Sequence, residues 1–277
     1  MVTPIHSNGN GVNYRQEGQG TPVVLIHGIA ASLYDWVNMM PELAAHGYHA
    51  YALDLLGHGE SYKPGDPQEY HVEALFRHFT NWVAQLGLNT PLLLVGHSLG
   101  GYLSLQFALR FPARVRGLVL IDPFYDIKQL SPWLRLVRRR PHLGAKAMQA
   151  VPEWLINFIL GWDPSSSADF SPLARQQIAN DYKRASPHFV YITRDIPPLT
   201  PSLHQVEVPT LVIWGEHDNT LRPETFKCLA ERLPRATSHP IPECGHQPHI
   251  GKPALVNQLV LDFLTRIPTV DPAPASM

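Results

Sequence analysis

The residues best suited to chemistry surround Ser98, in the segment Val95–Gly101 (Val-Gly-His-Ser-Leu-Gly-Gly). The apolar run Leu92–Val95 is typical of a buried strand, and apolar residues recur at helical spacing after the serine. Gly96 and Gly100 flank Ser98 at two residues on either side, where a closely approaching strand and helix leave no room for larger side chains. The pattern predicts a sharp strand–turn–helix with a nucleophilic serine at its apex, beside helix N–H groups that favour a developing oxyanion.

A serine hydroxyl becomes a nucleophile when a base takes its proton and a carboxylate holds that base in the right tautomer. Both partners are expected after strand ends, because ligands bind there in sheets of this kind. Asp218 follows one strand-like segment and is the preferred acid, with Asp122 as the alternative. His246 follows the last strand-like segment and is the preferred base, since Gly245 lets its loop turn; His249 is the alternative.

The oxyanion of an acyl-transfer reaction needs two converging N–H donors. Leu99 supplies one donor as the residue after the serine. The other is expected from the loop that follows His27-Gly28, most simply the N–H of Ile29.

These residues are positioned by alternating strand-like and helix-like segments, which predict an α/β fold with a right-handed, mostly parallel sheet. The strand-like runs are apolar throughout, as expected of strands covered by helices on both faces. Strands are expected at 22–28, 48–54, 92–95, 115–122, 209–215 and 238–241. Helices are expected within 29–45, at 72–86, after Ser98, and at 224–233 and 253–267.

The alternation stops between 124 and 206, where helical stripes are expected at 133–137, 154–160 and 173–183. We predict that 124–206 is a helical cap on a core formed by 1–123 and 207–267, and that 268–277 is a mobile tail. Aromatic residues of the cap indicate an apolar substrate pocket; the candidates are Trp133, Trp154, Phe158 and Trp162.

Composition excludes several classes of protein. The chain has 277 residues, of which 44% are hydrophobic, and a net charge of −1, which argues against a nucleic-acid partner. With only two cysteines, Cys228 and Cys244, a disulfide framework is not expected and a reducing compartment is compatible. The N-terminus resembles no signal peptide, and no apolar run predicts membrane insertion. We therefore expect a cytoplasmic protein, a monomer or a homodimer.

Five ordered motifs resemble those of the α/β-hydrolase superfamily, over roughly residues 10 to 267. They are His27-Gly28, Asp54-x-x-Gly57-x-Gly59-x-Ser61, Gly96-x-Ser98-x-Gly100, Gly215-x-x-Asp218 and Gly245-His246. The resemblance implies an α/β-hydrolase fold with Ser98 as nucleophile, His246 as base and Asp218 as acid. It also implies that the N–H groups of Ile29 and Leu99 bind the oxyanion.

Two branches of the superfamily fit less well. Ser61-Tyr62-Lys63-Pro64 is similar to a segment of epoxide hydrolases and haloalkane dehalogenases, but those enzymes carry Asp where this chain has Ser98. C–C bond hydrolases usually show a Gly-Pro-Gly type loop where this chain reads Ile29–Ser32 (Ile-Ala-Ala-Ser).

We therefore predict a serine hydrolase that cleaves small carboxylic esters with apolar acyl or aryl groups. No cofactor and no metal are expected, because neither the histidines nor the cysteines show metal-ligand spacing. A C–C bond hydrolase, a lactonase, a cofactor-free perhydrolase and a slow-turnover ligand receptor remain as alternatives.

Overall fold

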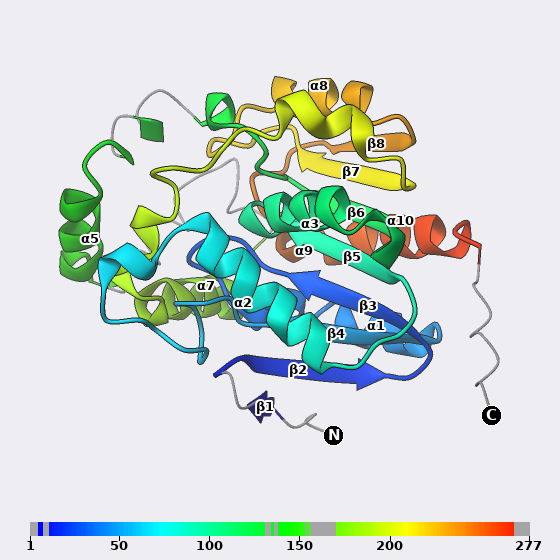
Figure 1. The fold of residues 1–277 in the computed structure, drawn as a ribbon. Helices are drawn as coiled ribbons and strands as arrows, with labels where there is room; N and C mark the ends of the chain where they lie inside the picture. The colour runs from blue at the N-terminus through cyan, green and yellow to red at the C-terminus, as the bar shows by residue number, and fades with distance from the viewer. Residues whose placement is uncertain are drawn as a thin grey trace.

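The computed structural model describes residues 5–7, 11–130, 134–135, 138–152, 154–155 and 170–268. They form an eight-stranded sheet with helices on both faces and further helices beyond one edge (Figure 1). The expected α/β class is confirmed. Among these residues, no helix combines the length and apolarity that a membrane crossing requires.

The sheet is parallel except at one side. In sheet order the strands are β1 (Ile5–Ser7), β2 (Asn13–Gly18), β4 (Tyr48–Leu53), β3 (Thr21–Ile26), β5 (Leu92–His97), β6 (Val115–Ile121), β7 (Thr210–Gly215) and β8 (Ala236–Ile241). β2 pairs antiparallel with both β1 and β4, and every neighbouring pair from β4 to β8 is parallel. The parallel strands therefore end at one common edge, where the loops that carry Ser98, Asp218 and His246 begin.

Both faces of the sheet are buried, and successive residues of a strand belong to different cores. In β5, Leu92 and Leu94 pack in one cluster, whereas Leu93 and Val95 pack in the other. The first cluster includes residues of α2 (Val72–Gln85), α3 (Leu99–Arg110) and α8 (Glu224–Arg232). The second includes residues of α1 (Met40–Ala45) and α10 (Pro253–Thr265). Burial on both faces explains why the strands read as continuous apolar runs.

The segment between β6 and β7 contains helices and turns, and no strand among its described residues. These are η4 (Ile127–Gln129), α5 (Pro141–Ala150), α7 (Pro172–Arg184), η5 (Pro187–Tyr191) and η6 (Thr200–Gln205). α7 matches the stripe expected at 173–183, whereas α5 was not expected. The stripes at 133–137 and 154–160, and the tail after residue 268, lie largely outside the described residues. Figure 1 shows α5 and α7 beyond the edge at which the parallel strands end.

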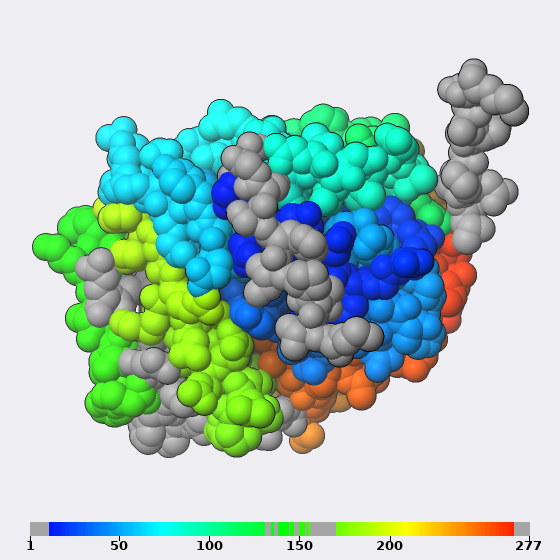
Figure 2. All heavy atoms as spheres, turned by 90° about the horizontal axis from the view of Figure 1, so that it is seen from below, coloured from blue at the N-terminus to red at the C-terminus, as the bar shows by residue number. Residues whose placement is uncertain are grey.

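The segment between β6 and β7 is fastened to the loop that follows β4. The N–H of Ser186 donates to the carbonyl of Gly57 (2.8 Å), and Arg184 forms an ion pair with Glu60. His58 of the same loop stacks on Phe189, with 5.7 Å between ring centroids. Figure 2 shows the yellow-green surface of this part of the chain lying against the cyan surface of residues from the first third. These contacts hold the segment near the strand ends that carry the candidate site.

Candidate active site

Ser98 lies at the turn between β5 and α3 with φ 51° and ψ −113°, a conformation that residues other than glycine rarely adopt. Its N–H donates to the carbonyl of Ile121 (3.0 Å), and its carbonyl accepts from the N–H of Phe124 (3.0 Å). A Cβ on Gly100 would overlap the carbonyl of Ile26 at the end of β3. Close approach of α3 to the sheet therefore requires glycine beside the serine, and the neighbouring strand holds the strained residue in place.

The side chains of Ser98, His246 and Asp218 form a continuous chain of hydrogen bonds. Ser98 Oγ lies 3.0 Å from His246 Nε2, and His246 Nδ1 lies 2.7 Å from Asp218 Oδ2. The other oxygen of Asp218 accepts from the N–H groups of Thr220 (2.7 Å) and Leu221 (2.9 Å). An ionised carboxylate only accepts, so the proton of the neutral imidazole lies on Nδ1 and Nε2 presents a lone pair to the hydroxyl. This arrangement can activate the hydroxyl as a nucleophile.

Asp122, the alternative acid, lies beside Asp218 rather than in its place. It is fully buried, and its Oδ1 accepts from the N–H of Gly215 (3.0 Å). Burial, together with the negative charge of Asp218, raises the pKa of Asp122 well above its ordinary value. The raised pKa favours the neutral carboxylic acid, whose hydroxyl would donate to Asp218. Sequence reasoning placed both aspartates at strand ends but missed this partnership, because the adjacency of β6 and β7 is a property of the sheet.

The two expected oxyanion donors, Leu99 and Ile29, belong to segments that meet at Ser98. Leu99 is the first residue of α3, and no hydrogen bond is recorded for its N–H or for that of Ile29 in the described part of the chain. A Cβ on Gly28 would lie 3.1 Å from Ser98 Cβ, so the loop after β3 passes directly beside the serine. The side chain of His27 supports this loop. Its Nε2 accepts from the N–H of Leu55, which lies in the loop after β4 (3.0 Å), and its Nδ1 donates to the carbonyl of Gly28 (2.7 Å).

The other candidates fare differently. His249 is buried and makes no hydrogen bond with Ser98 among the described residues, so the structure places His246 rather than His249 against the serine. Trp154 is 69% exposed. Trp133, Phe158 and Trp162 lie outside the described residues. The pocket that these four aromatic residues were expected to line therefore stays a prediction.

Comparison with known proteins establishes the family. Residues 21–253 match the sequence profile of the family described as "alpha/beta hydrolase fold". The chain belongs to this family. This α/β hydrolase is also similar in structure to a thermophilic esterase from Thermogutta terrifontis, with a TM-score of 0.80, 25% identity, and 97% of this chain and 100% of the esterase covered.

Curated relatives of this α/β hydrolase differ in their reactions. The 2-hydroxymuconate semialdehyde hydrolase of Pseudomonas sp. (strain CF600) is 30% identical over 271 residues, which cover 91% of this chain and 89% of that enzyme. Bifunctional epoxide hydrolase 2 of Sus scrofa is 25% identical over 310 residues, which cover 94% of this chain and 55% of that protein. The chain thus spans about half the length of the latter relative.

Proposed function

We propose that this α/β hydrolase is a serine esterase that cleaves carboxylic esters with apolar acyl or aryl groups. The observation that carries the proposal is the chain of hydrogen bonds Ser98–His246–Asp218. Its members lie in the loops that follow β5, β8 and β7, at one edge of the sheet. A serine at this position argues against epoxide hydrolysis, because the epoxide hydrolase branch has an aspartate there. Similarity to the Thermogutta esterase over the whole chain supports the ester substrate class.

In the proposed reaction, Ser98 Oγ attacks the ester carbonyl while its proton moves to His246 Nε2. The N–H groups of Ile29 and Leu99 stabilise the negative oxygen of the tetrahedral intermediate. Collapse of that intermediate breaks the ester C–O bond, and the imidazolium returns its proton to the leaving alkoxide. Water then attacks the acyl-enzyme, loses a proton to His246, and releases the carboxylic acid and the serine hydroxyl. Ionised Asp218 stabilises the imidazolium in both halves, and the reaction uses no cofactor.

The second candidate is hydrolysis of a C–C bond next to a carbonyl. The 30% identity to 2-hydroxymuconate semialdehyde hydrolase over 91% of this chain favours it. The reaction would use the same triad, but the leaving group would be a carbanion that must be protonated on carbon. The esterase proposal requires no such carbon protonation, and the loop Ile29–Ser32 departs from the Gly-Pro-Gly type of the C–C hydrolases.

We also propose that residues 124–206 act as a cap that selects the substrate over a core of residues 1–123 and 207–267. Apolar residues of this segment, Phe189, Ile192, Ile196 and Leu199, pack in the same cluster as Leu99 beside the nucleophile. Tyr102 of α3 also donates to the carbonyl of Pro197 (2.9 Å), which ties the segment to the nucleophile's own helix. Such a roof would exclude water from the acyl-enzyme and add apolar contact area at about 0.8 kcal/mol per buried methylene.

The test is a panel of p-nitrophenyl esters of increasing acyl length beside a 2-hydroxy-6-oxo-dienoate, the substrate type of C–C hydrolases. We expect turnover of short and medium esters by the wild type and none by Ser98→Ala. A fluorophosphonate probe should label the peptide that contains Ser98. Turnover of the dienoate alone would favour the second candidate, and labelling of another serine would refute the assigned nucleophile. Stoichiometric ester cleavage without turnover would indicate a receptor.

A further inference from the structure

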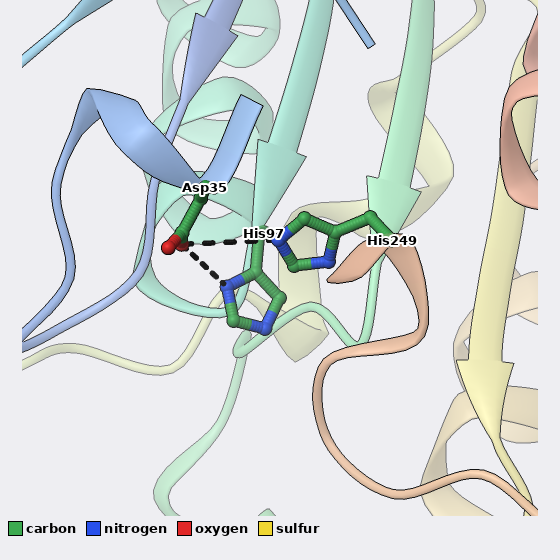
Figure 3. A group of neighbouring side chains, drawn as sticks. All are labelled: Asp35, His97 and His249. Carbon is green, nitrogen blue, oxygen red and sulfur yellow. Dashed lines mark ion pairs between the residues drawn. The ribbon is translucent and has the colours of Figure 1, made fainter. Parts of the chain in front are cut away.

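Three buried side chains that the proposed reaction does not use converge in the interior, one of them next to Ser98 in the sequence (Figure 3). Asp35 belongs to η1 (Leu33–Trp36), His97 is the last residue of β5, and His249 lies in α9 (Pro248–Gly251). Their side chains are 4%, 2% and 1% exposed. Figure 3 shows the Asp35 carboxylate facing a ring nitrogen of each histidine, with the three residues supplied by three separate elements.

The facing atoms are close but do not bond to one another. Asp35 Oδ2 lies 3.9 Å from His97 Nδ1 and 3.8 Å from His249 Nε2, and the three atoms lie within 4.8 Å of one another. These separations are too long for direct hydrogen bonds. Each of the three atoms is buried without a hydrogen-bond partner among the described residues. Buried polar atoms are rarely left unpaired, so three that face one space indicate an occupant of that space.

The protonation of His97 restricts what the occupant can be. His97 Nε2 lies 2.8 Å from the backbone carbonyl oxygen of His246, which only accepts, so Nε2 carries the hydrogen. With the hydrogen on Nε2, the neutral ring holds a lone pair on Nδ1. A lone pair and a carboxylate oxygen therefore face each other, which favours a cation between them.

We propose that Asp35, His97 and His249 form a binding site for one divalent transition-metal ion of the zinc class. Two imidazole nitrogens and one carboxylate oxygen are ligands that such ions accept, and three protein ligands leave a position for water. His97 also donates its other N–H to the carbonyl of His246, as metal-bound histidines commonly do. This site could not be predicted from the sequence, because Asp35 lies 62 residues before His97 (97 − 35) and His249 lies 152 residues after it (249 − 97).

The geometry needs little adjustment to hold such an ion. Ligand atoms about 2.0–2.2 Å from zinc are roughly 3.3–3.6 Å from one another in a tetrahedral or trigonal arrangement. The two separations that involve Asp35, 3.8 and 3.9 Å, exceed this range by a few tenths of an ångström, and the two histidine nitrogens lie within 4.8 Å of each other. Asp35 and Ile250 also line a cavity of about 460 Å³ beside α7, which brings that cavity up to one of the three ligands. Because His97 bonds to the backbone of His246, the ion would also steady the loop of the proposed base.

The test uses the untagged full-length protein, stripped with EDTA and then equilibrated with Zn²⁺ or Co²⁺. Elemental analysis after gel filtration should find one Zn²⁺ per chain, and Co²⁺ should give visible d–d absorption of a low-coordinate ion. Asp35→Asn and His249→Gln should each weaken binding by at least about tenfold. His204→Gln removes an exposed histidine elsewhere and is the matched control, which should bind like the wild type.

Two results would overturn the proposal. Substoichiometric binding by the wild type would leave an ordered water as the occupant of the space. Equal binding by the wild type, Asp35→Asn and His249→Gln would assign the metal to other histidines of the chain, which has 15 in all. Circular dichroism checks that the variants fold. If His249→Gln does not, His249→Cys replaces it: a thiolate-to-cobalt charge-transfer band supports the site, and absence of the band in folded protein refutes it.

Discussion

Replacing Asp218 by asparagine should place the proposed base in the wrong tautomer. Asp218 Oδ1 accepts from the N–H groups of Thr220 and Leu221, at 2.7 and 2.9 Å. The NH₂ group of an asparagine cannot face two donors, so the amide oxygen must take that place and the NH₂ group must face His246 Nδ1. Nδ1 then has to accept, and the ring proton moves to Nε2, where it points at Ser98 Oγ. The serine loses its base although the packing is almost unchanged.

The expected loss is about 10³- to 10⁴-fold in kcat, by analogy with tautomer loss in serine proteases. This corresponds to roughly 4–5.5 kcal/mol of transition-state stabilisation at about 1.36 kcal/mol per tenfold change in rate. Asp122→Asn is the matched control. Its amide oxygen can accept from the N–H of Gly215, and its NH₂ group can donate to Asp218, as a protonated Asp122 carboxyl would. We expect a loss of less than about tenfold, since a neutral donor replaces a neutral donor.

The assay is steady-state hydrolysis of a p-nitrophenyl ester, with active sites titrated by a fluorophosphonate and folding checked by thermal unfolding. The reasoning would be refuted if Asp122→Asn lost more kcat than Asp218→Asn, because Asp122 would then be the carboxylate on which His246 depends. A retained rate in folded Asp218→Asn would show that His246 does not depend on the carboxylate. A third variant, Asp122→Leu, removes the donor and should fall between the other two.

Three further predictions follow from the same geometry. Ser98→Ala should abolish ester hydrolysis while leaving the urea midpoint close to that of the wild type or higher, because it removes one hydroxyl from a strained residue; activity above background in purified protein would contradict it. Gly100→Ala should lower the free energy of unfolding by at least about 1–3 kcal/mol, because the added Cβ overlaps the backbone carbonyl of Ile26, which cannot change rotamer as a side chain can. An unchanged urea midpoint would contradict this prediction and would mean that α3 can shift. Burial lowers the pKa of His58 to about 3 in the folded state, whereas a free histidine titrates near ~6.5. As the pH falls from ~6.5 towards 3, the His58 side chain therefore binds a proton in the unfolded state before it does so in the folded state. The free energy of unfolding that is present above pH ~6.5 is then lost by up to about 1.36 kcal/mol per pH unit. His58→Asn, which can keep the donor to the carbonyl of Leu56, should show a shallower fall in urea unfolding between pH 7 and 5, and equal slopes would contradict this assignment.

Much of the core was predictable because its signals are local. The apolar runs at 22–28, 48–54 and 115–122 correspond to β3, β4 and β6, each ending one or two residues before the predicted limit. These strands are easy to recognise in the sequence because a strand covered on both faces is apolar at successive positions and does not alternate with polar residues. In contrast, α5 (Pro141–Ala150) was missed. Its sequence, Pro-His-Leu-Gly-Ala-Lys-Ala-Met-Gln-Ala, carries a glycine and no clean apolar stripe, so its helical state depends on what it packs against.

The candidates for the triad followed from their positions after strands of a parallel sheet, but position left Asp122 and His249 open as alternatives. The relation between Asp122 and Asp218 was not predictable, because 96 residues separate them (218 − 122) and only the pairing of β6 with β7 brings them together. Charge could not be assigned either. Two carboxyl groups look equivalent in a sequence, and the burial of Asp122 beside Asp218 is what raises its pKa.

The amino-acid sequence by itself determined the strands of the parallel sheet, the elbow at Ser98 and the order of serine, acid and base, because strand periodicity and glycine's small size act over a few residues. Tertiary structure alone decided which histidine meets the serine, which aspartate contacts that histidine, and that Asp35, His97 and His249 lie together in the interior. These outcomes depend on distances between elements far apart in the chain and on the exclusion of water around them. Both are set only when the two faces of the sheet are covered.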